Sequence, residues 1–353
     1  MEMPPKEILR IIDANLNRAS EGLRVLEEYA RMALNDSDMT QRLKDMRHNL
    51  AVNDNGMQTR LVQAREAAGD VGSDMKAAGQ DEQKDDAAII VANSRRAQES
   101  LRVLEETAKT HDTGQNTDSY RKARFILYTI EKEVMAGIQR REKLNRLKGL
   151  YVIIDTGALG GRDHIKAAEQ AIRGGARALQ LRDKELKKKE LIGVAEKISK
   201  LCRESGVLFI VNDYLDVALA ADADGLHVGG EDLPPGTARR LLPGDKILGC
   251  SARTVEGAGE AMAQGADYLG TGGMYPTTSK AANDVIGTEG LKKIRKAVDA
   301  TLVAIGGINK DNIREVIKAG ADAIAVINAV TGAEDIEMAA RELTDIIEGG
   351  SHG

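Results

Sequence analysis

The sequence lacks tryptophan and has few aromatic residues or cysteines. With only Phe125 and Phe209 as phenylalanines, we expect no aromatic base-stacking surface for nucleic acid. Cys202 and Cys250 are isolated and far apart, which excludes a CxxC metal site and fits a reducing compartment. The net charge of −5 indicates neither a nucleic acid nor an anionic membrane as partner. Because no apolar run is long enough to span a bilayer and residues 1–10 are charged, we expect a cytoplasmic protein without a signal peptide.

The first 145 residues have a helical pattern that contains an internal repeat. Residues 15–28 (NLNRASEGLRVLEE) reappear as residues 93–106 (NSRRAQESLRVLEE). Apolar residues recur at helical spacing in both copies, which predicts burial against a partner helix. They are Ala19, Leu23, Leu26 and Ala30 in the first copy, and Ala97, Leu101, Leu104 and Ala108 in the second.

Polar residues of the repeat are also identical, although a solvated helix face requires only polarity. One explanation is Arg–Glu pairing three residues apart, worth a few tenths of a kcal/mol per pair. The other is a pseudo-twofold bundle whose Arg and Asn side chains face a shared anionic pocket. The repeated pairs are Asn15/Asn93, Arg18/Arg96, Glu21/Glu99, Arg24/Arg102 and Glu27/Glu105.

Two segments between the copies also carry polar groups. Residues 44–48 read KDMRH, and residues 65–74 (REAAGDVGSD) contain the glycines and carboxylates of either a functional loop or a helix end with a turn. With residues 13–16 and the repeat, the second segment resembles the single-function hydroxymethylpyrimidine-phosphate kinase domain. The resemblance implies that this part makes a pyrimidine diphosphate from ATP. No Walker A or kinase glycine loop places the nucleotide, so an oligomerisation scaffold remains the alternative and a homo-oligomer remains open.

After about residue 146 the pattern changes to short β-rich runs that alternate with helices such as 186–204 and 255–264. Eight such units in about 200 residues fit an α/β fold, the (β/α)8 TIM barrel. We therefore expect an all-helical domain over 1–146 and a barrel over 147–353, with a doubly wound open sheet as the alternative. The expected strands are 150–155, 178–184, 207–213, 225–229, 247–253, 268–273, 302–308 and 323–330.

Barrel active sites lie at the carboxyl ends of the strands, and the expected strand ends carry two kinds of group. Cationic and hydroxyl groups suit phosphate, whereas the carboxylates Asp213 and Asp232 suit Mg²⁺ bridged to phosphate oxygens. Asp213 could instead cap the next helix, and His227 is interpreted as a packed histidine. A second phosphate site is expected at the backbone of Gly306, Gly307, Ile327 and Asn328. The cationic and hydroxyl set is Arg182, Lys184, Ser251, Thr277, Ser279 and Lys280.

Residues 149–346 resemble thiamine-phosphate synthase through several motifs in the expected order. These motifs are QLRDK (180–184), ND (212–213), GLHVG (225–229), EDLP (231–234), PTTSK (276–280) and IGGI (305–308). The resemblance implies that hydroxymethylpyrimidine diphosphate ionises to a carbocation, which the nitrogen of hydroxyethylthiazole phosphate captures. It implies small-molecule partners, Mg²⁺ on Asp213 and Asp232, and catalytic roles for Arg182, Lys280 and Ser251.

The resemblance also implies substrate-binding residues. They are Gln180, Leu181, Arg182, Asp183, Lys184, Asn212, Ser251, Thr277, Thr278, Ser279, Lys280, Gly307, Ile327 and Asn328. Gly230, Gly273 and Asn328 depart from the residues usual in the family, from which we expect altered affinity. Two alternatives remain: a barrel isomerase or aldolase-like enzyme using Lys184 or Lys280, and a non-catalytic regulator of the same fold, which should lack Asp213, Asp232 or Lys280.

Overall fold

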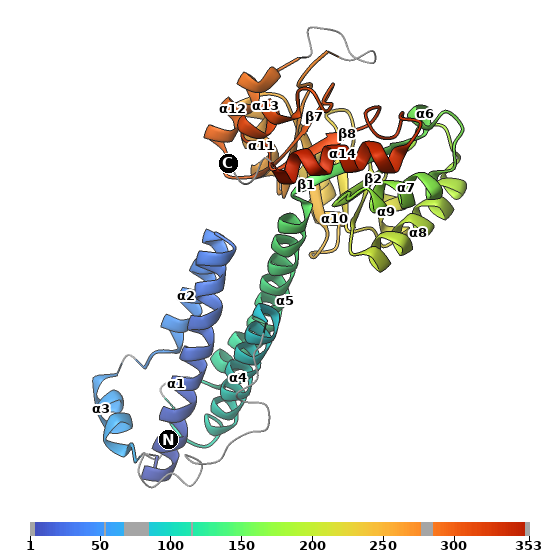
Figure 1. Cartoon of the computed structure of the whole chain (residues 1–353). Coiled ribbons are helices and arrows are strands. Elements are labelled where there is room, and N and C mark those ends of the chain that lie inside the picture. Colours follow the sequence, from blue (N-terminus) through green and yellow to red (C-terminus); the bar gives the residue numbers. More distant parts are fainter. Residues whose placement is uncertain (1–3, 53, 67–84, 114–115, 277–284, 350–353) are drawn as a thin grey trace. The chain divides into compact units, whose positions relative to one another are not determined.

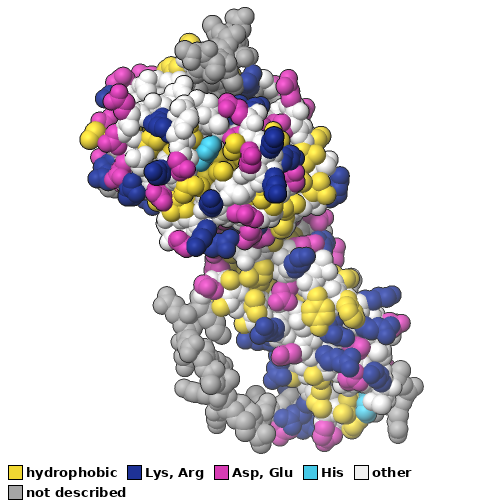
Figure 2. All heavy atoms as spheres, turned by 90° about the vertical axis from the view of Figure 1, so that its right-hand side faces the viewer, with side chains coloured by type: hydrophobic (Ala, Val, Ile, Leu, Met, Phe, Trp, Pro, Cys, Tyr) yellow, Lys and Arg dark blue, Asp and Glu magenta, His cyan; other side chains and the backbone are white. Residues whose placement is uncertain are grey.

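The computed structural model describes residues 4–52, 54–66, 85–113, 116–276 and 285–349. It divides into two compact units, Met1–Gln139 and Arg140–Gly353. The division falls within the long helix α5 (Thr117–Leu147), and the predicted boundary near 146 lies at the end of that helix. Within the described residues, no helix is both long and apolar enough to cross a membrane. Basic and acidic side chains are interspersed over the face shown in Figure 2.

The first unit is helical, as predicted, and the two copies of the repeat fall on α1 and α4, which pack against each other (Figure 1). All eight apolar residues of the predicted stripes are buried. Because the stripes face inward, the apolar spacing explains why these segments form a bundle. The helices of this unit are α1 (Lys6–Glu28), the π-helix η1 (Tyr29–Ala33), α2 (Ser37–Leu50), α3 (Asn55–Ala64), α4 (Asp86–Thr107) and the larger part of α5.

The repeated glutamates Glu27 and Glu105 are buried, with 4% of each residue exposed. Each accepts hydrogen bonds from the arginine three residues earlier in its helix and from an arginine of a neighbouring helix. A buried carboxylate without partners would be costly, so this double pairing explains the identity of both residue types. The arginines are Arg24 (2.7 Å) and Arg47 (3.0 Å) for Glu27, and Arg102 (3.0 Å) and Arg124 (3.1 Å) for Glu105.

The repeated asparagines are also used within the helices. Asn15 Nδ2 donates to the Ile11 carbonyl and Asn93 Nδ2 to the Ile89 carbonyl, each at 2.8 Å. These asparagines and the two paired arginines therefore do not form the shared anionic pocket that was the second explanation of the repeat. Ion pairing, the other explanation, is confirmed for Arg24 with Glu27 and for Arg102 with Glu105.

The second unit contains a closed barrel of eight parallel strands in sequential order (Figure 1). Strand β1 pairs with both β2 and β8, so the open-sheet alternative is wrong. The strands are β1 (Gly149–Asp155), β2 (Ala178–Arg182), β3 (Leu208–Asn212), β4 (Gly225–Val228), β5 (Ile247–Ala252), β6 (Tyr268–Gly272), β7 (Thr301–Ile305) and β8 (Ala323–Val326). The helices are α6 (Thr156–Leu159), α7 (His164–Arg173), α8 (Lys188–Ser205), α9 (Leu215–Ala220), α10 (Pro235–Leu241), α11 (Val255–Ala263), α12 (Gly287–Ala297), α13 (Ile313–Lys318) and α14 (Ile336–Gly349).

Alternation along each strand divides the barrel core into two layers. Inward residues such as Tyr151, Ile210 and Tyr268 fill the interior, whereas Leu179 and Phe209 pack outward against the helices. Strand β7 ends earlier than predicted. The two glycines that follow it, 306 and 307, have φ of 108° and 67°, so the backbone leaves the extended conformation and the strand ends at Ile305.

Candidate active site

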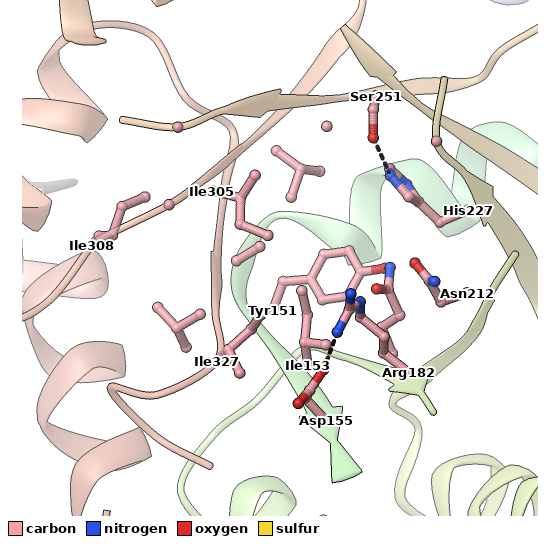
Figure 3. Close-up of a pocket in the computed structure, with 18 of the residues that line it drawn as sticks. Tyr151, Ile153, Asp155, Arg182, Asn212, His227, Ser251, Ile305, Ile308 and Ile327 are labelled. Carbon is pink, nitrogen blue, oxygen red and sulfur yellow. Dashed lines mark hydrogen bonds and ion pairs between the residues drawn. The ribbon is translucent and has the colours of Figure 1, made fainter. Parts of the chain in front are cut away.

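A cavity of about 590 Å³ opens at the carboxyl ends of the barrel strands. Figure 3 shows that its lining has two sides. Arg182, Asn212 and His227 face it from β2 to β4, and Ser251 from β5, which makes this side polar. The opposite side, from β7 and β8, presents isoleucines and backbone: Ile305, Gly306, Gly307, Ile308 and Ile327.

Most of the predicted site residues that the structure describes line this cavity. The side chain of Leu181 instead packs in the outer core, and that of Asp183 is also not part of the lining. Thr277, Thr278, Ser279 and Lys280 lie outside the described residues. The lining residues are Gln180, Arg182, Lys184, Asn212, Asp213, Asp232, Ser251, Gly307, Ile327 and Asn328.

Asp213 and Asp232 form the acidic part of the cavity. Asp213 has φ of 63° and is the centre of a three-residue turn in which Tyr214 N donates to the Asn212 carbonyl at 2.7 Å. Its side chain does not cap α9, so the capping alternative is wrong. Burial, then a hydrogen bond and repulsion from Asp232, raises the pKa of Asp213 to about 6.

The two cations of the QLRDK motif have different surroundings. Arg182 pairs with Asp155, whose other carboxylate oxygen caps α6 at Ala158 N (3.0 Å). Lys184 is 63% exposed at its side chain and lies 4.0 Å from Asp213. Arg182 is therefore held in place by β1, whereas Lys184 is free to move toward an anion.

Asp183 anchors the loop that carries these cations. Its Oδ1 accepts the backbone N–H groups of Glu185 (2.8 Å) and Leu186 (2.7 Å), and Thr156 donates its hydroxyl to Oδ2. Burial alone would raise the pKa of Asp183, but these hydrogen bonds and nearby His164 lower it below its ordinary value. The carboxylate thus stays ionised and fixes the loop after β2.

A continuous chain of hydrogen bonds joins five residues of the cavity lining. Gln180 Nε2 donates to Tyr151 Oη at 2.8 Å, and Tyr151 Oη lies 3.2 Å from Tyr268 Oη. Tyr268 Oη lies 3.2 Å from His227 Nδ1, and His227 Nε2 lies 3.1 Å from Ser251 Oγ. Burial lowers the pKa of His227 to about 4, so the imidazole is neutral at pH 7.

The NH₂ group of Gln180 can only donate, so Tyr151 accepts this hydrogen bond. The other hydrogen bonds fit either direction, since hydroxyl groups and a neutral imidazole both donate and accept. In the direction in which Tyr151 donates to Tyr268 and Tyr268 donates to Nδ1 of His227, the imidazole proton is on Nε2 and the hydroxyl proton of Ser251 is available to a group in the cavity.

Tyr151, Asp155 and Tyr268 were not predicted as site residues from the sequence, and His227 was predicted to be a packed residue. His227 is packed, yet it also lines the cavity and orients Ser251. Strand periodicity places Asp155 on the same face of β1 as Tyr151, so the position of Asp155 at a strand end is a signal that could have found it.

These features define the class of the protein: a (β/α)8 barrel with a polar cavity at the end where enzymes of this fold carry their active sites. Among the described residues no cluster of three or more His, Cys, Asp or Glu side chains could hold a metal. A family model described as thiamine monophosphate synthase matches residues 150–330, and one described as the ThiD2 family matches residues 10–133.

Relatives match both the barrel and the whole chain. A thiamine-phosphate synthase of Prochlorococcus marinus (strain MIT 9313) is 36% identical over 343 residues, covering 96% of both chains. Another, from Moorella thermoacetica, is 52% identical over 199 residues, covering 56% of this chain and 95% of its own. The solved thiamine phosphate pyrophosphorylase of Pyrococcus furiosus is 46% identical, with a TM-score of 0.55, and covers 59% of this chain and 98% of its own.

The chain belongs to the thiamine-phosphate synthase family. The family and the barrel fold predicted from the sequence are confirmed, and the match of the N-terminal part is consistent with the predicted kinase-like family.

Proposed function

We propose that the barrel joins hydroxymethylpyrimidine diphosphate to hydroxyethylthiazole phosphate and releases pyrophosphate. The observation that supports this most is the meeting of Arg182, Lys184, Asp213 and Asp232 in one cavity. The bond that breaks joins the pyrimidine methylene carbon to a diphosphate oxygen, and its electron pair leaves with pyrophosphate. The bond that forms joins this carbon to the thiazole nitrogen, which supplies its lone pair.

Arg182 and Lys184 would stabilise the charge that develops on the departing pyrophosphate. Ser251 would donate its hydroxyl proton to a ring nitrogen of the pyrimidine and so orient the methylene carbon. The apolar side of the cavity would hold the thiazole ring, with its phosphate at the backbone of Gly307, Ile327 and Asn328. This reaction requires positioning and charge stabilisation rather than a general base, which agrees with a neutral His227.

The acidic pair fits Mg²⁺. Two neighbouring carboxylates, one with a raised pKa and with Lys184 at 4.0 Å, suit a cation that usually takes one or two carboxylates and phosphate oxygens. Asp213 and Asp232 would hold the ion, which supplies charge neutralisation for the diphosphate. Lys280 has a proposed role at the same leaving group.

The test is pyrophosphate release by the full chain. It should require Mg²⁺ and both substrates, and it should stop on addition of EDTA. Asp232→Asn should lower turnover by about tenfold or more. The matched control is Asp216→Asn, at an exposed surface pair with Lys188 (2.5 Å), which should stay within about twofold. Release without the thiazole substrate, or equal turnover in both variants, would refute the assignment.

For the helical unit we propose phosphorylation of hydroxymethylpyrimidine phosphate by ATP, supported by the ThiD2 family match. The terminal phosphoryl group of ATP would pass to the monophosphate and give the diphosphate and ADP. The full chain incubated with ATP and hydroxymethylpyrimidine phosphate should form the diphosphate. Absence of this product would favour the oligomerisation scaffold. The boundary near 146 remains a prediction.

A further inference from the structure

A groove in the helical unit gathers residues from three segments noted in the sequence that the barrel does not use. It encloses about 800 Å³ between α1, α2 and α3. Asp13 comes from the first segment, Arg47 and His48 from the second, and Arg65 from the start of the third. Segments 52 residues apart at Asp13 and Arg65 thus line one space.

The groove has a wall formed by an ion pair, and an apolar floor. Arg65 donates from Nε and Nη2 to the two carboxylate oxygens of Asp13, at 2.8 and 2.9 Å. This bidentate pair ties the end of α3 to α1. Leu50 and Leu61, which are 5% and 4% exposed, lie beneath. The charge of Arg65 is used by Asp13, so binding of an anion depends on Arg47.

The internal repeat provides a comparison for Arg47, because Arg124 has the same role toward Glu105 that Arg47 has toward Glu27. Arg124 uses Nε and Nη2 for Glu105, and Nη1 for the hydroxyl of Tyr128 at 3.2 Å. Within the part of the chain that the structure describes, Arg47 donates to Glu27 from Nε alone. Its two terminal nitrogens have no hydrogen-bond partner among the residues that the structure describes, and Arg47 lines the groove.

The two halves of the repeat therefore differ where a ligand could bind. Both satisfy their buried glutamate. Among the described residues, the terminal guanidinium nitrogens of Arg124 have hydrogen-bond partners, whereas those of Arg47, which lines the groove, have none. Such a planar pair matches the oxygens of a phosphate group. One pair suits a single phosphate better than a triphosphate, for which this part of the sequence has no glycine-rich loop.

We infer that the groove binds a phosphorylated pyrimidine, with the phosphate on Arg47 and the ring on the floor of Leu50 and Leu61. This inference rests on the kinase activity proposed above and names the site of its acceptor substrate. His48, next to Arg47 at the end of α2, also lines the groove and would contact the same phosphate.

The test uses the absence of tryptophan from the chain. Val62 lines the groove and is 55% exposed, so Val62→Trp places a single fluorophore at the site. Titration of the full chain with hydroxymethylpyrimidine phosphate should give a saturable fluorescence change. Arg47→Met should weaken binding at least tenfold, whereas Arg124→Met should stay within twofold. Calorimetry on the same arginine variants with Val62 retained should give the same order of affinities.

Arg124→Met is a matched control because each substitution removes one of two arginines from a buried glutamate. Similar losses of thermal stability in the two variants would show that folding does not explain a difference in binding. Equal affinities in the two variants would overturn the inference. So would binding that calorimetry detects with the same affinity in Arg47→Met, and that does not change the fluorescence of the tryptophan at position 62.

Failure of the kinase proposal is distinguishable from failure of the groove. Binding that depends on Arg47 without formation of diphosphate from ATP would support the site and refute the activity. Formation of diphosphate at equal rates in Arg47→Met and Arg124→Met would support the activity and refute the site.

Discussion

Replacing Asp213 by asparagine is expected to stabilise the metal-free protein while it damages the proposed site. Burial and Asp232 raise the pKa of Asp213 from 3.8 to about 6. About two pKa units correspond to about 3 kcal/mol of unfavourable free energy above pH 6. Solvent screening and relaxation reduce this to about 1–2 kcal/mol, or a rise in melting temperature of roughly 2–6 °C.

The sign follows from linkage. An acid whose pKa is raised in the folded state binds its proton more tightly there, so its cost is present above pH 6. The cost declines as the pH falls through 6 toward 3.8. Melting curves of Asp213→Asn and the unsubstituted chain in EDTA should therefore differ at pH 7.5 and converge near pH 4.5.

Asp222→Asn is the control for the backbone. Asp222 also has a positive φ, of 49°, but Lys246 lowers the pKa of its carboxyl. The change from aspartate to asparagine has the same effect on the preference for a left-handed backbone at both positions. The electrostatic effects of the two substitutions on stability have opposite signs. We expect Asp222→Asn to lose a little stability at pH 7.5. A gain in both variants, or a gain in Asp213→Asn that persists at pH 4.5, would refute the electrostatic reasoning.

Four other predictions concern the framework of the site. Nitrogen NMR should find His227 neutral from pH 6 to 8. Tyr268→Phe, which removes one partner each from Tyr151 and His227, should cost about 2 kcal/mol of stability. Gly270→Ala places a methyl group 2.7 Å from His227 Cε1 and should cost about 1–3 kcal/mol in melting experiments, whereas Gly259→Ala, which meets no atom within 4 Å, should not destabilise the protein. Asp183→Ala frees two backbone N–H groups and should lower kcat more than Asp216→Ala does; equal kcat values would contradict an anchoring role.

The sequence predicted the polar lining of the cavity because each strand end carries its own local signal. Alternation placed Gln180, Arg182 and Lys184 on one side, and all three line the cavity. By the same alternation the side chain of Leu181 points outward from the barrel, and the structure places it there. The motif resemblance included it because such a resemblance marks segments without distinguishing side chains that face a cavity from those that face the core.

What the sequence did not predict depends on contacts between distant residues. Tyr151 and Tyr268 are 117 positions apart and meet only because the barrel closes. Arg47 and Glu27 lie on different helices, so the second arginine on each repeated glutamate has no signal in helical spacing. The exact repetition of Glu27 as Glu105 nevertheless marked a constraint stronger than solvation.

The barrel site separates two tasks that would conflict if one set of residues performed both. In the cavity lining, a neutral chain from Gln180 to Ser251 pairs its polar groups with one another, so it fixes geometry without a net charge. At the mouth, Asp213 is left poorly compensated, which costs stability in the free protein, and Lys184 is exposed 4.0 Å from it. A diphosphate with its metal would supply the missing partners. Ligand binding should therefore stabilise the mouth far more than the interior.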